Sequence, residues 1–137
     1  MRGGTYVGNP LVMRAGYEAT RLYERGDLYP HIDGLGERLR KGLRRAVENA
    51  RTEACVTGFG SMTKLHFLRK RIKKTDLKSL VTNTNHQAER NYFRYLTSNG
   101  MLAMIPGKVH FYISLPHNEE EIDRLITATE EFLGSMK

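Results

Sequence analysis

Apolar residues recur at helical spacing through the first 50 residues of the chain. The first such segment begins at Asn9-Pro10 and ends before Gly26, because Asn is favoured as a helix cap, Pro at the first helical position and Gly after the last turn. A second helix is predicted over about residues 31–50, with an apolar stripe on one side and a charged face on the other. The stripe comprises Ile32, Leu35, Leu39, Leu43, Val47 and Ala50. The charged face comprises Arg38, Arg40, Lys41, Arg44 and Arg45.

The apolar period changes from helical to alternating after residue 53. Strands are predicted over about residues 54–59 and 62–68, and the glycine-rich turn between them indicates an antiparallel pair. A third strand is predicted after Pro106-Gly107, with one face buried. The face expected to be buried comprises Val109, Phe111, Ile113 and Leu115.

Three further helices complete the predicted fold. A short one contains Leu77 and Leu80, and a longer one passes through Tyr92 and is closed by Asn99-Gly100. The last helix opens at Asn118, whose three following glutamates favour a helix N-terminus and indicate a capping box. The order α-α-β-β-α-α-β-α lacks a regular βαβ period. It therefore predicts an α+β fold, a small and mostly antiparallel three-stranded sheet covered by helices.

Composition narrows the class of protein. The 137 residues allow one compact domain, and no apolar run approaches the roughly 20 residues of a membrane span, so no membrane partner is expected. The opening residues lack the apolar segment of a secretory signal, and the single cysteine, Cys55, has no partner for an internal disulfide. A cytoplasmic location is expected. The closely spaced ligand sets of zinc fingers and ribbons are also missing from the sequence.

The opening loop is the most informative segment for chemistry. Gly3 and Gly4 let backbone amides approach an anion, Thr5 adds a hydroxyl donor, and a helix start at Asn9-Pro10 is expected to supply further unpaired amides. A phosphate group would suit this loop. It is neither a Walker A loop nor a dinucleotide fingerprint. By local physics alone, the pattern favours a flexible terminus that leads into a capped helix.

Other polar groups have two interpretations each. The basic run over residues 69–74 and the net charge of +7 could attract a nucleic acid, but no base-reading motif or aromatic platform accompanies them, which favours a solvated loop. His117 and Glu120 could suggest a metal site, although carboxylates after Asn118 are typical of a helix N-terminus. Cys55 is interpreted as a small core residue rather than a reactive thiol.

Three segments together resemble a known enzyme family. Residues 3–11 read Gly-Gly-Thr-Tyr-Val-Gly-Asn-Pro-Leu and resemble the Gly-Gly-Thr-x-x-Gly-Asn-Pro-Leu segment of class III aminotransferases, which are pyridoxal-phosphate (PLP) enzymes of fold type I. Gly60-Ser61-Met62 and residues 113–123 are similar to segments of the glutamate-1-semialdehyde 2,1-aminomutase branch and its transaminase relatives. The three occur in the family's order, and they match only the C-terminal part of such an enzyme.

This resemblance implies a division of the chain and a site. Residues 1–26 would form the phosphate-binding loop and the connector helix between domains, and residues 27–137 the small C-terminal domain. Thr5, with Gly4 beside it, would contact the phosphate of PLP in the active site of the neighbouring subunit of a dimer. In the complete enzyme the reaction would move an amino group on a small amino-acid substrate.

The resemblance also implies what this chain does not supply. In the family, the lysine that forms the Schiff base with PLP lies upstream of the Gly-Gly-Thr segment, so no catalytic residue is expected here and the chain alone is expected to be inactive. The implied partners are a missing large domain or a second copy. Two alternatives stay open: a non-catalytic interaction module or separately encoded half of such an enzyme, and, with support only from charge, a basic nucleic-acid-binding domain.

Overall fold

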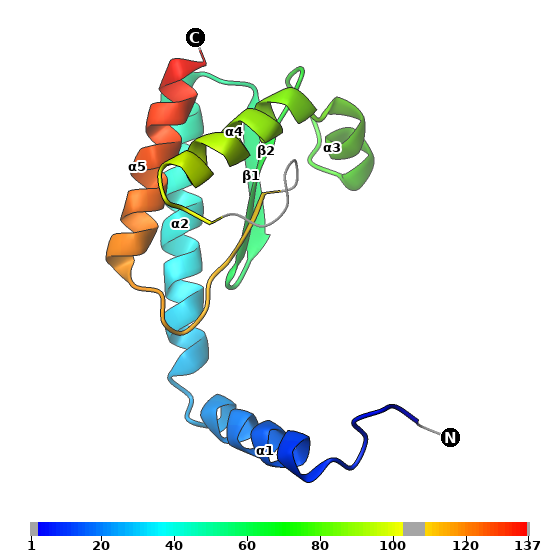
Figure 1. Cartoon of the computed structure of the whole chain (residues 1–137). Helices are drawn as coiled ribbons and strands as arrows, with labels where there is room; N and C mark the ends of the chain where they lie inside the picture. The colour runs from blue at the N-terminus through cyan, green and yellow to red at the C-terminus, as the bar shows by residue number, and fades with distance from the viewer. Residues whose placement is uncertain (1–2, 103–108, 137) are drawn as a thin grey trace.

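The structure of the protein is a computed structural model that describes residues 3–102 and 109–136. Within these residues, helices and strands follow the predicted order, which confirms the α+β fold class (Figure 1). The elements are α1 (Pro10–Glu24), α2 (Leu28–Ala50), β1 (Ala54–Phe59), β2 (Met62–Phe67), α3 (Leu77–Asn83), α4 (His86–Ser98), β3 (His110–Tyr112) and α5 (Glu119–Ser135). None of the helices described combines the length and the apolar content that crossing a membrane requires.

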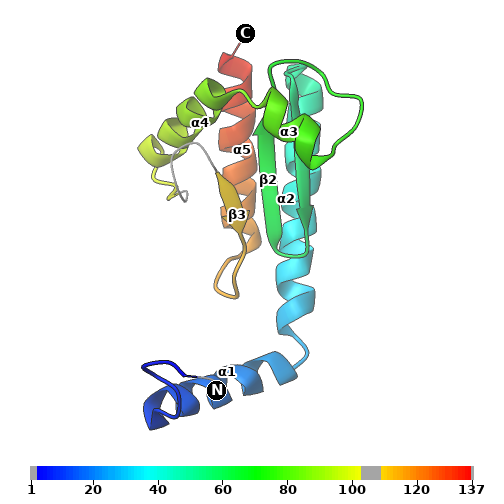
Figure 2. The same cartoon turned by 90° about the vertical axis from the view of Figure 1, so that its right-hand side faces the viewer.

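The three strands form one antiparallel sheet in the order β1-β2-β3. Val56 pairs with Leu65 across β1 and β2, and Thr63 pairs with Phe111 across β2 and β3. The long helices α2 and α5 run side by side behind the sheet, and the view in Figure 2 looks onto the opposite face. The fold is thus two layers, with α3 and α4 at the upper end of the sheet.

The core lies between the sheet and the helices because alternate residues of β2 point to one side. Leu65 and Phe67 are buried, and the ring of Phe67 lies 5.3 Å from that of Tyr92 on α4 and 5.8 Å from that of Phe132 on α5. The hydroxyl of Tyr92 is fully buried and forms a 2.6 Å hydrogen bond with the hydroxyl of Thr129. This bond satisfies a polar group that would otherwise be costly to bury.

Two glycines let α2 approach its neighbours closely. A Cβ atom on Gly36 would overlap the carbonyl oxygen of Gly60 in the β1–β2 turn, and one on Gly42 would overlap the side chain of Ile126 on α5. A larger residue at either position would push these elements apart, and a packed core has little room to absorb such a shift. Glycine at these positions therefore sets the distance from α2 to the turn and to α5.

Helix α1 extends away from the rest of the molecule (Figure 1). It joins α2 through Gly26, whose φ of 76° is in the left-handed region that favours glycine, and none of the residues of α1 is buried. Several of its large apolar residues are instead exposed to solvent. They are Leu11, Val12, Met13, Tyr17, Leu22 and Tyr23.

The structure corrects the predicted start of α2 and the predicted end of β2. Helix α2 begins at Leu28 rather than near residue 31, because Pro30 lies in the first turn, where a missing N–H costs no hydrogen bond. Strand β2 ends at Phe67, and Leu68 forms only an isolated bridge with Thr84.

The third strand is shorter than predicted. Strand β3 covers only His110–Tyr112, and Pro106-Gly107, which were expected to precede it, lie outside the described residues. Ile113 is buried as predicted, but Leu115 is 49% exposed, which contradicts the expected buried face. The reason is a tight turn, in which the N–H of His117 donates to the carbonyl oxygen of Ser114 at 3.0 Å and ends the alternation.

The close approach at Gly36 can be tested by substitution. Gly36→Ala should lower the free energy of unfolding by about 1–3 kcal/mol, because the new methyl group must displace the backbone of the β1–β2 turn. The measurement is urea denaturation followed by circular dichroism. The matched control is Gly34→Ala on the same helix, where a Cβ atom meets nothing within 4 Å, and this change should be neutral or stabilise by up to about 1 kcal/mol. Equal effects of the two substitutions would contradict the packing argument.

Candidate functional site

The loop before α1 is built from two consecutive turns. The N–H of Val7 donates to the carbonyl oxygen of Gly4 at 3.1 Å, and the N–H of Asn9 donates to that of Tyr6 at 3.2 Å. Thr5 lies in the first turn and is exposed. Its hydroxyl and its N–H have no hydrogen-bond partner among the residues that the structure describes. Both donors are therefore available to an external acceptor.

The start of helix α1 differs from the sequence prediction. We expected unpaired amides there, but the side-chain oxygen of Asn9 accepts from the N–H of Leu11 at 3.0 Å and of Val12 at 3.2 Å. Pro10 has no N–H, and the N–H of Met13 already donates to the carbonyl oxygen of Asn9. The cap thus occupies the amides of the first turn. A phosphate would instead meet the Thr5 hydroxyl and loop amides, with the positive end of the helix dipole nearby.

These residues fit the phosphate of PLP in chemical type. A phosphate needs several hydrogen-bond donors and favours a helix N-terminus, and the turn at Thr5 offers a hydroxyl and the amides of Thr5 and Tyr6 without competing acceptors. A Cβ atom on Gly4 would meet only the side chain of Val7, at 3.5 Å. The described residues therefore leave space beside Gly4.

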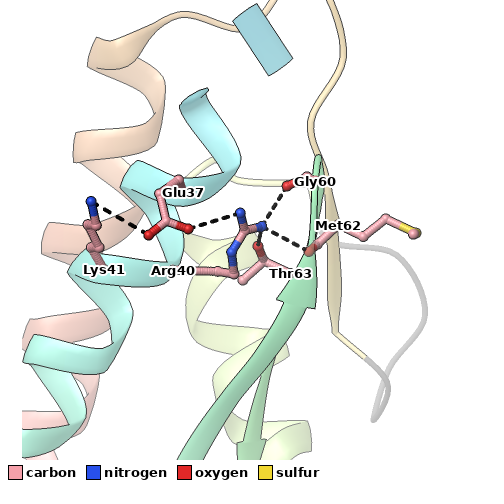
Figure 3. Close-up of polar contacts among 6 residues, drawn as sticks. All are labelled: Glu37, Arg40, Lys41, Gly60, Met62 and Thr63. Carbon is pink, nitrogen blue, oxygen red and sulfur yellow. Dashed lines mark hydrogen bonds and ion pairs between the residues drawn. The ribbon is translucent and has the colours of Figure 1, made fainter. Parts of the chain in front are cut away.

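A second predicted segment, Gly60-Ser61-Met62, forms the turn between β1 and β2 and is held by a buried arginine. Figure 3 shows the guanidinium of Arg40 reaching from α2 to this turn. Its Nη1 donates to the carbonyl oxygen of Gly60 at 2.5 Å and to that of Met62 at 3.4 Å, and its Nη2 donates to Glu37 at 3.2 Å. The hydrogen bond from Arg40 lowers the pKa of the Glu37 carboxyl below its usual value.

The sequence pattern puts Arg40 on the charged face of α2, opposite the apolar stripe, but the structure buries it. Only 6% of the residue is exposed. A buried charge is tolerated where a counter-charge and hydrogen bonds compensate for the lost hydration, and Glu37 with the turn carbonyls provides both. The glycine at position 36 makes the space that the guanidinium enters, since a Cβ atom there would lie 3.1 Å from Arg40 Nη1.

The sheet face opposite α2 and α5 carries a polar cluster. Lys64 on β2 pairs with the buried carboxylate of Glu89 on α4 at 3.6 Å, and His86 approaches the same carboxylate at 3.5 Å. His66 forms a 2.7 Å hydrogen bond with the hydroxyl of Thr57. Burial, and secondarily the nearby Lys64, lowers the pKa of His66 to about 4, so its imidazole is neutral at pH 7. The sequence pattern had not indicated the buried Glu89.

The third family-like segment, residues 113–123, is a turn and a helix cap. Ser114 N–H donates to His117 Nδ1 at 3.0 Å, and the side chains of Asn118 and Glu121 form the predicted capping box. Within residues 3–102 and 109–136, no three or more His, Cys, Asp or Glu side chains lie close enough together to hold a metal ion. His117 and Glu120 are therefore not part of such a group. This segment therefore orients α5 against the sheet.

The remaining candidates lie apart from the phosphate loop. The basic residues of the run over 69–74 form an exposed loop, as the sequence indicated. Cys55 is half-buried on β1, and burial raises the pKa of its thiol, so it is less reactive than a fully exposed thiol. The two predicted site residues, Gly4 and Thr5, are neighbours in the sequence and lie in the same turn.

Comparison with known proteins places these features in context. No family model matches the chain. The chain is 27% identical over 132 residues to glutamate-1-semialdehyde 2,1-aminomutase of Clostridium botulinum (strain Eklund 17B / Type B), an alignment that covers 96% of this chain and 30% of that protein. The chain thus spans less than a third of the length of this curated relative.

Solved structures agree on the fold. A transaminase with PLP bound matches 98% of this chain and 29% of its own at 26% identity, with a TM-score of 0.76. An omega-transaminase from Sphaerobacter thermophilus matches 97% of this chain and 30% of its own at 22% identity, with a TM-score of 0.75. A glutamate-1-semialdehyde-aminomutase (K286A) from Pseudomonas aeruginosa PAO1 in complex with PMP covers 81% of this chain and 24% of its own at 21% identity, with a TM-score of 0.72.

The fold and the sequence therefore match a C-terminal fragment of PLP-dependent aminotransferases and aminomutases, and the resemblance found in the sequence is confirmed. Glutamate-1-semialdehyde aminomutase is among the relatives by both sequence and structure.

The half-buried His66 gives the protein a pH dependence. The folded-state pKa of His66, about 4, is below its usual 6.5, so the unfolded chain binds a proton first as the pH falls. The contribution of the neutral imidazole to stability is therefore complete above pH 6.5 and is lost between about pH 6.5 and 4. His66→Gln should reduce the fall in urea midpoint between pH 7 and pH 4.5. An identical fall in the wild type and the variant would contradict the assignment.

Proposed function

We propose that this chain supplies the small domain and a phosphate-binding loop of a PLP-dependent aminotransferase or aminomutase that moves an amino group on an amino-acid-type substrate. The similarity to such enzymes in sequence and fold supports this proposal. The single observation that carries it is the turn at Thr5, whose hydroxyl and N–H are exposed and unpaired among the described residues, next to a helix start with a fixed cap.

The geometry of the described residues supports the proposed division of the chain. In this proposal, residues 1–26 are the loop and the connector helix, and residues 27–137 are the small domain. The left-handed Gly26 stands between α1, which buries none of its residues, and α2, which is part of the core. The loop can therefore lie against another domain or another subunit while the small domain keeps its own packing.

PLP, when bound, would act as the electron sink for amino-group movement. The proposed task of Thr5 is to donate a hydrogen bond to the phosphate, while Gly4 leaves room for the backbone to approach. Arg40 has a positioning task, since it holds the turn at Gly60 against α2. No residue of this chain is assigned a proton-transfer step.

The proposed partners are a large domain of the same enzyme and, in a dimer, a second copy. The exposed apolar residues of α1, together with Tyr6 and Val7 in the loop, support a partner, because burying them would remove a large apolar area from water. A cytoplasmic setting belongs to the same proposal and agrees with the single free cysteine, Cys55.

The 137-residue chain by itself should not retain PLP. A lysine that reacts with a carbonyl needs a desolvated pocket, whereas Lys64 is engaged by Glu89 and the other described lysines are exposed. We expect no PLP-derived absorption after incubation and dialysis, and no transaminase activity. A retained absorption band that disappears on substitution of one lysine would refute this expectation.

The role of Thr5 can be tested by pairing this chain with a large domain from an aminotransferase relative, as a fusion or by co-expression. In an assembly that binds PLP, Thr5→Val should weaken cofactor binding about 10- to 100-fold, because a hydrogen bond to a charged group contributes roughly 1.5–3 kcal/mol. Thr5→Ser should restore most of the affinity, since it keeps the hydroxyl. The measurement is titration with PLP at fixed salt.

The control for this titration is Thr20→Val on α1, where the threonine hydroxyl donates to the helix carbonyl of Gly16 at 2.9 Å. It should leave the affinity for PLP unchanged. Thermal unfolding of the isolated chain should be the same for Thr5→Val and the wild type, because Thr5 packs against no core residue. Equal affinity of wild type and Thr5→Val for PLP would remove Thr5 from the site.

A further inference from the structure

The loop between β2 and α3, residues 69–76, is fixed to the body of the protein at both ends. At its start, the N–H of Arg69 donates to the carbonyl oxygen of Asn83 at 2.8 Å, beside the bridge between Leu68 and Thr84. At its end, the carboxylate of Asp76 accepts from the N–H of Ser79 at 2.8 Å and caps α3. Ile72, in the middle, is half-buried. The loop therefore presents its other side chains on a defined surface.

These other side chains are mainly cations. Five of the six residues from Arg69 to Lys74 carry a positive charge, and all five are exposed. Within the part of the chain that the structure describes, none of them forms an ion pair, and the nearest acidic residue in the sequence, Asp76, is occupied as a cap. Five unpaired like charges repel one another, so a negatively charged partner would reduce this electrostatic repulsion.

Helix α3 adds apolar side chains to the same surface. Leu77 is 79% exposed and Val81 is 63% exposed, and their spacing of four residues puts them on one side of the helix. Leu80, by contrast, is half-buried. Figures 1 and 2 both place α3 at the end of the molecule opposite α1. We call residues 69–74 with Leu77 and Val81 the basic–apolar surface.

We infer that the basic–apolar surface is a docking site for an acidic protein segment that carries apolar side chains. Carboxylates of such a segment would pair with the cations of residues 69–74, and its apolar side chains would cover Leu77 and Val81. The site is separate from the phosphate loop and from α1, so it does not depend on the function proposed above.

The composition of the surface favours a protein over other polyanions. A nucleic acid would pair with the cations, but residues 69–83 contain no aromatic side chain for base stacking, and Leu77 and Val81 would stay exposed. A membrane surface requires a longer amphipathic helix, often with aromatic anchors, whereas α3 has seven residues. An acidic segment with apolar side chains would pair with the cations of residues 69–74 and would also cover Leu77 and Val81.

The test is fluorescence anisotropy of the full chain with a labelled synthetic peptide of glutamates in which every fourth residue is leucine. We expect binding that weakens as salt rises. The combined change Lys70→Gln, Arg71→Gln and Lys73→Gln should weaken it at least about tenfold, and Leu77→Ser with Val81→Ser should weaken it by a similar factor. The same peptide with alanine in place of leucine should bind more weakly to the wild type.

The matched control removes three positive charges elsewhere, by Arg14→Gln, Arg21→Gln and Arg25→Gln, in residues that already pair with Glu18 or Asp27. This variant should bind the peptide like the wild type, and an equal loss in both triple variants would overturn the inference in favour of net charge alone. A single-stranded oligonucleotide or phosphatidylserine vesicles that bind as tightly as the leucine peptide, with no effect of Leu77→Ser and Val81→Ser, would also overturn it. All substituted residues are exposed, and thermal melts verify the fold of each variant.

Discussion

The close approach of α2 to its two neighbours is the constraint on which the rest of the structure depends. At Gly36 the helix backbone meets the β1–β2 turn, and at Gly42 it meets Ile126 of α5, so one helix sets the position of both layers. Arg40, between these glycines, fills the remaining space with a guanidinium that is bonded to the carbonyl oxygens of the turn. Because this charge is buried, losing its partners would be costly, and the turn is therefore held against α2.

This arrangement separates a rigid body from an extended arm. The sheet, α2 and α5 share a core that includes Tyr92 and Phe132, whereas α1 and the loop before it bury no side chain. The Thr5 turn has its own internal hydrogen bonds, but its place relative to the core is set through the α1–α2 junction at Gly26, where the rings of Tyr23 and Tyr29 lie 6.4 Å apart. A phosphate-binding role for Thr5 thus requires a surface that α1 can pack against, in agreement with relatives more than three times as long as the part matched here.

The two faces of the sheet have different chemistry because neighbouring residues of a strand point to opposite sides. Leu65 and Phe67 point toward α2 and α5, so the residues between them, Lys64 and His66, must point the other way. They are partly covered there, and each finds a polar partner, Glu89 for the lysine and Thr57 for the histidine. A domain that met this face would find a neutral imidazole and an ion pair, together with the exposed side chains of Met62 and Tyr112.

Local signals in the sequence determined the order of the elements, the fold class and the helix caps, because caps, turns and apolar periods act over only a few residues. The family segments were recognisable for the same reason, while the phosphate role of Gly4 and Thr5 stays a prediction. The burial of Arg40 and Glu89 and the exposure of Leu115 were decided by tertiary structure, since each depends on an element distant in the sequence or on a turn that ends a strand. A periodic pattern reports which side of a helix a residue occupies, but not whether a neighbour supplies the hydrogen bonds that make burying a charge favourable.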